Sequence, residues 1–291
     1  MTDRSGPGLA WDAEGRSQRL RRNAAAVPLR VLREPFLLSE VWHKVRARSV
    51  DRRHRTRVAA YARLATSPSA AVAQLLDVEP AAVEAWLRAP SARAVTERLE
   101  RYRPPNHALP MGGPAFLDLA YALVRLLRPP IVVETGVAHG YSSAVLLHAL
   151  AEAGDGVLYS VDLPAFRPGV RTHTGAAARF VLEETALDRW TLFVGPDRKV
   201  LPSLLPRIEP VVLCSYDSDK SYRGMTRSLE LLWRSLAPGG VILVDDVEVH
   251  DGFLDFVQER TARWAVVAKP VCPPLYARSA FAGLVRRTEG S

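Results

Sequence analysis

The chain has 291 residues, of which 48% are hydrophobic and 24% charged; this composition fits one large α/β domain with a smaller appendage and excludes a chain that is disordered throughout. Its two cysteines, Cys214 and Cys272, exclude a disulfide-stapled fold and favour a reducing cytoplasm. The net charge of +8 is concentrated at the N-terminus, because residues 1–60 contain 14 Lys and Arg against 6 Asp and Glu.

Hydropathy gives no sign of a membrane protein. No stretch approaches the roughly 20 apolar residues that a membrane helix needs, and the N-terminus lacks the apolar core of a signal peptide. We therefore expect a cytoplasmic protein with no membrane partner.

The first third of the chain is predicted to be helical. Residues 1–30 are rich in Arg, Gly, Ser and Ala, which is typical of a basic flexible arm, and residues 31–105 form a small all-α region that would act as a lid or in dimerisation. From Leu37 to Leu64 the apolar positions recur at helical spacing. The segment Val72–Leu87 predicts two short helices with helix-turn-helix spacing, but the second helix carries no basic face for reading DNA.

After a proline-rich linker at Tyr102–Pro110, apolar strands alternate with helices over the remainder of residues 106–291. This alternation predicts a doubly wound, mostly parallel α/β sheet with helices on both faces. The seven expected strands are Ile131–Gly136, Val157–Asp162, Thr191–Gly195, Val211–Asp217, Val241–Asp246, Trp264–Lys269 and Phe281–Arg287.

The first of these strands runs into a glycine turn with Gly-x-x-x-Gly spacing at Gly136 and Gly140. Glycines at such a turn let backbone N–H groups approach a ligand, but the spacing departs from the dinucleotide fingerprint. Asp162 ends the next strand, where a carboxylate would hold a ribose diol. Together these features indicate a nucleoside ligand without a pyrophosphate.

Two further strand ends are acidic, in Tyr216–Tyr222 and Gly239–Asp246. With them, the run from about Met111 onward resembles the class I S-adenosylmethionine-dependent methyltransferases. Within that family it is similar to the metal-dependent O-methyltransferases, which include the catechol and caffeoyl-CoA enzymes and bacterial macrolide and aminocoumarin sugar enzymes. The resemblance implies a Rossmann-like fold of seven strands with an antiparallel C-terminal strand.

The resemblance also assigns roles to individual residues. It implies that S-adenosylmethionine is bound by Glu134, Gly136, Gly140, Ser142, Asp162, Asp197, Arg198 and Asp217. It implies that a divalent metal is bound by Asp217, Asp245 and Asp246. Lys220 matches the catalytic lysine of the catechol enzymes, and Asp219 matches the acid proposed as base in some sugar enzymes.

The chemistry of the residues agrees with a metal site. Three carboxylates from two strand ends form a hard oxygen site that suits Mg²⁺ or a similar divalent cation. Such an ion would position two oxygens of an acceptor and lower the pKa of a hydroxyl, whose proton Lys220 or Asp219 would take. The alternative is that these acids only cap neighbouring helices.

Three functions are weighed on these features. We expect an O-methyltransferase that acts on a hydroxylated small molecule, such as a sugar or a polyketide or phenolic natural product. A nucleic-acid methyltransferase would use the basic N-terminus for phosphate contacts, but the strand end Tyr216–Asp219 lacks the Pro-Pro signature of amino-group methylation. A helix-turn-helix regulator with a cofactor-sensing domain is the third, and a homo-oligomer is left open. His107 and His250 are considered as bases on the substrate side, although a lone histidine is more often structural.

Overall fold

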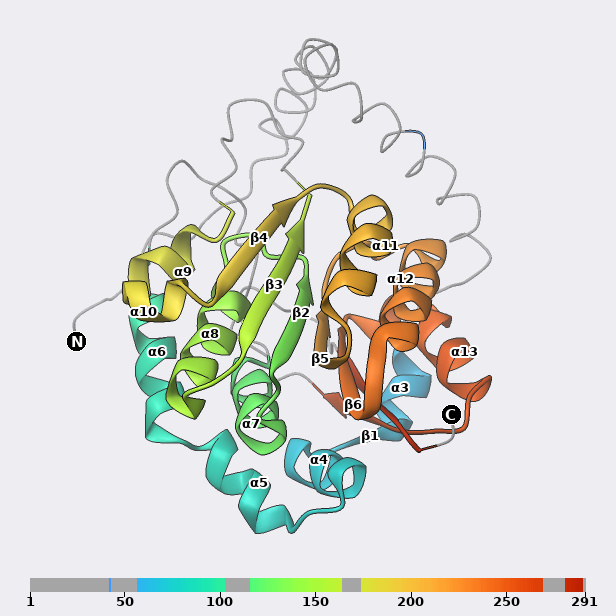
Figure 1. Cartoon of the computed structure of the whole chain (residues 1–291). Helices are drawn as coiled ribbons and strands as arrows, with labels where there is room; N and C mark the ends of the chain where they lie inside the picture. Colours follow the sequence, from blue (N-terminus) through green and yellow to red (C-terminus); the bar gives the residue numbers. More distant parts are fainter. Residues whose placement is uncertain (1–41, 43–56, 103–115, 164–173, 269–280, 290–291) are drawn as a thin grey trace, which may run out of the picture.

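The computed structural model describes residues 42, 57–102, 116–163, 174–268 and 281–289. The described residues form one eight-stranded sheet with helices against both faces (Figure 1). The expected basic arm and most of the expected linker lie outside the described residues. Among those residues, no helix is both long and apolar enough to cross a membrane.

The sheet is mixed, with strand order β1-β7-β8-β6-β5-β2-β3-β4. Its strands are β1 (Ala65–Thr66), β2 (Ile131–Thr135), β3 (Val157–Asp162), β4 (Trp190–Val194), β5 (Val211–Tyr216), β6 (Leu236–Asp245), β7 (Ala262–Ala268) and β8 (Phe281–Arg287). The strand β8 is antiparallel to β6 and β7, and the other neighbours are parallel. The seven expected strands are present as β2–β8, and the antiparallel C-terminal strand is confirmed.

The prediction of seven strands and an all-α N-terminal region is wrong in one respect. Ala65 and Thr66 form an eighth strand, which pairs in parallel with Val266 and Val267 of β7. Ala65 ends helix α3 in an extended conformation, and Ser67 is extended as well because Pro68 disfavours the α conformation of the residue before it. The pairing covers the edge of β7, which would otherwise present unpaired backbone groups.

Helices cover the sheet in two layers. Figure 1 shows one layer around α7 and α8 and the other around α11 and α12. The first layer contains α6 (Pro90–Glu100), α7 (Leu117–Leu127), α8 (Tyr141–Ala153), α9 (Ala176–Val181) and α10 (Glu184–Leu187). The second contains α3 (Val58–Leu64), α11 (Asp197–Ile208), α12 (Tyr222–Ser235) and α13 (Gly252–Gln258), with the short helix η1 (Val247–Val249) nearby; α4 (Pro68–Leu76) and α5 (Pro80–Leu87) lie at one end of the sheet.

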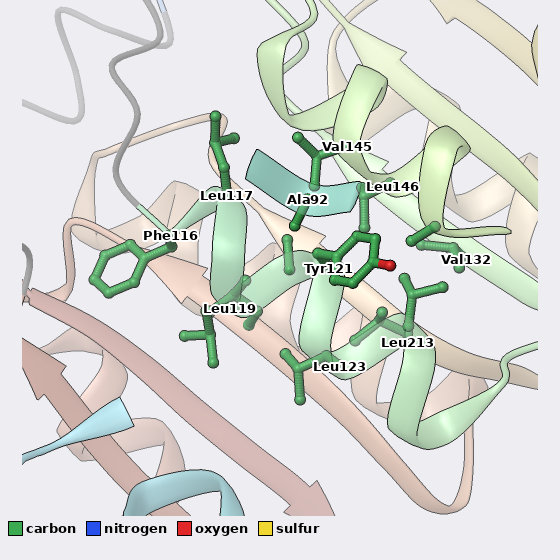
Figure 2. Packing of buried hydrophobic residues seen from close by; sticks show 14 of the residues in the cluster. Ala92, Phe116, Leu117, Leu119, Tyr121, Leu123, Val132, Val145, Leu146 and Leu213 are labelled. Atoms are coloured by element: carbon green, nitrogen blue, oxygen red, sulfur yellow. The ribbon is translucent and has the colours of Figure 1, made fainter. Parts of the chain in front are cut away.

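The alternation of side chains along β2 creates two hydrophobic cores. Val132 packs into a cluster with Tyr121 and Leu146 (Figure 2), whereas Val133 belongs to the cluster on the opposite face. The helices before the sheet contribute buried residues to the first cluster, including Val72 and Val83. Residues 57–102 therefore share a core with the sheet and do not bury a separate one.

Candidate active site

The strand β2 ends in a tight turn at Gly136. Its backbone lies in the left-handed region at φ +84°, and its N–H donates a hydrogen bond to the carbonyl oxygen of Val161 at 2.9 Å. A Cβ at this position would overlap the carbonyl oxygen of Asp217, just after β5. Glycine is required here because it permits both the conformation and the close approach. The predicted glycine turn is confirmed, and it lies directly against Asp217.

Gly140 closes the turn and opens helix α8. Its φ is +86°, and a Cβ there would lie 2.7 Å from the Cα of Gly175, which precedes α9. The N–H groups of Gly175 and Ala177 donate to the carbonyl oxygens of Ala138 (3.0 Å) and His139 (2.8 Å). The turn is therefore fixed between the end of β5 and the start of α9.

Glu134, the last but one residue of β2, is only 1% exposed. Its Oε1 accepts a hydrogen bond from Ser142, and its Oε2 accepts from Ser143 and Ser160, each at 2.6 Å. The indole N–H of Trp190 donates to Ser160 at 2.8 Å and extends the network. Burial raises the pKa of Glu134 above its usual range, although the three serine hydrogen bonds act to lower it. Glu134 and Ser142, both predicted as cofactor ligands, thus bind each other and hold α8 on β2.

Asp162, at the end of β3, lies beside the glycine turn as predicted. Its Oδ1 accepts from the backbone N–H groups of Val137 (3.0 Å) and Ala138 (3.4 Å), and its Oδ2 accepts from the Thr174 hydroxyl (3.0 Å). Burial raises the pKa of this carboxyl, and the hydrogen bonds from the turn oppose the shift. The side chain is half-buried, so the turn and the acid form one continuous surface.

Asp197 begins helix α11 on the other side of the strand ends. Its Oδ1 accepts from the backbone N–H of Arg198 (2.6 Å), and its Oδ2 accepts from Ser218 (2.7 Å) and Ser228 (3.0 Å). The carboxylate therefore ties α11 to α12 and to the residue after Asp217. The adenine-binding role expected for Asp197 and Arg198 stays a prediction.

The three acids predicted to bind a metal lie together. Asp217 follows β5, whereas Asp245 and Asp246 lie at the end of β6, and these strands are neighbours with Tyr216 opposite Val244. One carboxylate oxygen from each acid lies within 4.8 Å of the others. Parallel pairing therefore brings residues about 28 positions apart in the sequence to one edge of the sheet.

The ammonium group of Lys220 lies among these acids. Its Nζ is 2.6 Å from Oδ1 of Asp217, 3.4 Å from Oδ2 of Asp246 and 3.9 Å from Oδ2 of Asp245, and it donates a hydrogen bond to the backbone oxygen of Asp245 at 3.0 Å. Burial acts to lower the pKa of Lys220, but the three carboxylates act more strongly together and raise it above its usual range. The cluster of Asp217, Asp245 and Asp246 therefore holds a cation supplied by the chain itself.

Comparisons with known proteins bear directly on this arrangement. Residues 133–247, which include both the glycine turn and the acidic cluster, match a family described as a methyltransferase domain. Comparison with curated proteins gave no match.

Solved structures show the same fold. The O-methyltransferase TomG from Streptomyces achromogenes, involved in tomaymycin synthesis and solved with S-adenosylmethionine, is 20% identical over 68% of this chain and 90% of its own, with a TM-score of 0.51. The methyltransferase PaMTH1 from Podospora anserina, solved with S-adenosylhomocysteine, is 18% identical over 71% of this chain and 94% of its own, with a TM-score of 0.51. An O-methyltransferase from Bacillus cereus, solved with S-adenosylhomocysteine, is 18% identical over 70% of this chain and 100% of its own, with a TM-score of 0.50.

Residues 133–247 are thus similar to a methyltransferase domain, and the chain shares its fold with structures solved with S-adenosylmethionine or S-adenosylhomocysteine. In this chain the two predicted groups of site residues, the glycine turn with Asp162 and the acids with Lys220, meet where Gly136 contacts Asp217. The spatial convergence expected from the sequence is confirmed.

Asp219, the second residue predicted as a base, has a different environment from Lys220. Its Oδ1 accepts from the backbone N–H of Ser221 at 3.0 Å, and a Cβ at Gly224 would overlap its carboxyl group. Asp219 therefore packs against the first turn of α12. Of the two candidate bases, Lys220 is the one that contacts the acidic cluster.

The sequence analysis did not identify three side chains that donate hydrogen bonds to Glu134, Asp162 and Asp197. Ser160 lies opposite Glu134 in the pairing of β2 with β3, and a serine inside an otherwise apolar strand was the available signal. Thr174 and Ser218, which bind Asp162 and Asp197, gave no comparable signal because their partners are distant in the sequence.

The histidine at position 250 is a weak candidate for a base on the substrate side. It is only 2% exposed, and its Nδ1 accepts from the backbone N–H of Gly252 at 3.0 Å. Its ring lies edge-on to Tyr222, at 5.5 Å between centroids. His250 therefore stabilises the segment between β6 and α13. His107 lies outside the described residues.

Proposed function

We propose that the chain is a cytoplasmic S-adenosylmethionine-dependent O-methyltransferase that methylates a hydroxyl of a small molecule, such as a sugar or a polyketide or phenolic natural product, with the help of Mg²⁺ or a similar cation. One observation carries the proposal: the glycine turn at Gly136 lies directly against Asp217, so a cofactor on the turn and an acceptor at the acids would be neighbours. The S-adenosylmethionine-bound TomG supports the choice of cofactor.

The residues present fit both groups. Asp217, Asp245 and Asp246 offer carboxylate oxygens, the ligands that Mg²⁺ prefers, and they already surround one cation. Asp162 offers a half-buried carboxylate beside the turn, suited to a ribose diol.

When bound, the cofactor supplies an electrophilic methyl group, and the cation supplies a positive charge that orients acceptor oxygens and lowers the pKa of a hydroxyl. The chain contributes the rest. Its turn and Asp162 would hold the nucleoside, and its three acids would fix the position of the acceptor. Lys220 would accept the hydroxyl proton at Nζ after losing its own proton to water, a loss that a cation bound by the acids favours because it offsets the carboxylates that raise the pKa of Lys220.

Helix α5, the second helix of the helix-turn-helix spacing, favours a small-molecule acceptor over DNA. Helix α5 buries Val83 in the shared core, and its exposed positions include Ala81, Ala82 and Ala85. This face has no basic side chains for a DNA groove.

A panel of catechols, sugars and phenolic polyketides, incubated with S-adenosylmethionine and Mg²⁺, tests the proposal. We expect S-adenosylhomocysteine to form with at least one acceptor, the new methyl group to be on oxygen, and the activity to be lost in EDTA and in Asp245→Ala. The same substitution at the exposed Asp188 should leave turnover intact. Undiminished turnover in EDTA, or a methyl group on nitrogen or carbon, would contradict the proposal.

A further inference from the structure

The acidic cluster is filled by the chain itself. Lys220 Nζ lies within 3.9 Å of a carboxylate oxygen from each of Asp217, Asp245 and Asp246. One carboxylate oxygen from each acid also lies within 4.8 Å of the others. The ammonium group therefore lies in the same small space where a cation bound by all three acids would be.

The positions of the four residues along the backbone explain why Lys220 Nζ lies among the acids. Asp217 follows β5, Asp245 ends the adjacent β6 and Asp246 follows it, so the fold brings three negative charges together. Lys220 comes three residues after Asp217, before α12 begins, and its Nζ is also anchored to the backbone oxygen of Asp245 at 3.0 Å. One positive charge thus offsets part of the repulsion among the carboxylates.

A divalent ion cannot coordinate all three acids while the ammonium group of Lys220 remains among them. Mg²⁺ binds oxygens at about 2.0–2.1 Å and needs near-octahedral geometry. The Nζ atom is 2.6 Å from Asp217 Oδ1, so it occupies the approach to that oxygen, and two cations so close would repel each other.

We infer that Lys220 is an internal counter-ion that competes with the divalent cation, and that the ion binds only when Nζ withdraws from Asp217. This inference rests on the proposed function for the presence of a divalent ion. It assigns to Lys220 a role in setting the affinity of the metal site, separate from its role toward the acceptor.

Calorimetric titration of the full chain with MgCl₂ at one fixed pH tests the inference without any turnover. We expect Lys220→Met and Lys220→Gln to bind Mg²⁺ about tenfold or more tightly than the wild type, because each removes a positive charge next to the ion. Lys199→Met removes the same charge from an exposed position on α11 and should leave the affinity unchanged. Thermal unfolding confirms that each variant is folded.

A second measurement uses the wild type alone. In crystals soaked with MnCl₂, anomalous scattering should place the ion among the three acids, and the distance from Lys220 Nζ to Asp217 Oδ1 should exceed hydrogen-bonding range. An ion bound with this hydrogen bond intact would overturn the inference.

The two possible failures differ. Equal Mg²⁺ affinities in the wild type and both Lys220 variants would overturn the inference and leave the proposed function standing. No Mg²⁺ binding in any of them would overturn the inference together with the role of the cation in the proposed function.

Discussion

At the scale of single residues, the site depends on positions where one residue type is compatible with the backbone. Gly136 has a positive φ and touches the backbone of Asp217, whereas Gly154, with φ +82°, has nothing within 4 Å of an added Cβ. Substitution of Gly154 therefore measures the free-energy cost of a positive φ alone, whereas substitution of Gly136 adds the cost of the steric overlap with Asp217.

We expect Gly154→Ala to lower the free energy of unfolding by about 1 kcal/mol, the usual cost of a left-handed alanine. Gly136→Ala should cost at least about 2 kcal/mol more, because its methyl group would overlap the backbone carbonyl oxygen of Asp217, which cannot move without shifting the end of β5. Urea unfolding measures both. Equal losses of unfolding free energy in the two variants would show that Gly136 does not lie against the backbone of Asp217.

Glu134 predicts a dependence of stability on pH. Its pKa in the folded chain lies above the ordinary value of 4.5, chiefly because the side chain is buried. Between those two values the folded chain binds more protons than the unfolded chain, so the free energy of unfolding falls as the pH rises through this window. Glu134→Gln removes the titrating group and should flatten that decline.

The measurement is urea unfolding of both proteins in steps from about pH 4 to about pH 8. The wild type should lose more stability over this range than Glu134→Gln. The account of Glu134 would be refuted by parallel curves.

At the scale of helices and strands, the N-terminal helices are joined to the sheet domain by polar contacts as well as by the core. Glu152 of α8 accepts hydrogen bonds from Ser91 of α6 and from Tyr121 (2.5 Å) and Arg125 (3.1 Å) of α7. His148 Nε2 also lies 2.7 Å from the Ser91 hydroxyl. One carboxylate therefore joins three helices.

Because its removal leaves several donors without their acceptor, we expect Glu152→Ala to lower the free energy of unfolding by about 1–3 kcal/mol. Glu97→Ala, at an exposed position of α6, should change it by less than about 0.5 kcal/mol. Chemical denaturation of the two variants distinguishes them, and similar values would mean that Glu152 does not hold the helices together.

Strands with a local sequence signal could be predicted, whereas a strand that depends on a contact distant in the sequence could not. The strands β2, β3 and β5 could be predicted because their β-branched residues, and the acid or glycine at the end of each run, are local signals. The strand β1 was not, because two residues carry no periodicity and their pairing with β7 is a long-range contact.

The same distinction applies to the site. The positions of Gly136, Asp162 and the three acids at strand ends could be predicted, because parallel strands end at a common edge. The direction of a side chain could not: Asp219 turns toward α12 and Asp197 toward two serines because of partners elsewhere in the chain.

At the scale of the whole molecule, residues 57–102 and the sheet form one hydrophobic core. Val72, Val83 and Val95 are fully buried in the cluster that also contains Val132 and Leu146. Removal of these helices would expose to water the apolar surfaces of α7, α8 and β7 on which they pack, at a cost of roughly 25 cal/mol per Å² of apolar surface.

We therefore expect a fragment of residues 103–291 to lack a cooperative thermal transition, whereas deletion of residues 1–30 should preserve it. Scanning calorimetry of the two truncations makes the comparison. A fragment of residues 103–291 that melts cooperatively would show that the sheet folds without the N-terminal helices and that the boundary expected near residue 106 separates independent domains.

The central claim is that the glycine turn, Asp162 and the acidic cluster form a single site. A crystal structure of the full chain grown with S-adenosylhomocysteine and Mg²⁺ tests it most directly. We predict the ligand against Gly136 and Gly140, its ribose hydroxyls on Asp162, and the ion among Asp217, Asp245 and Asp246. A ligand bound away from the turn, or acids that remain without an ion at saturating Mg²⁺, would contradict the account.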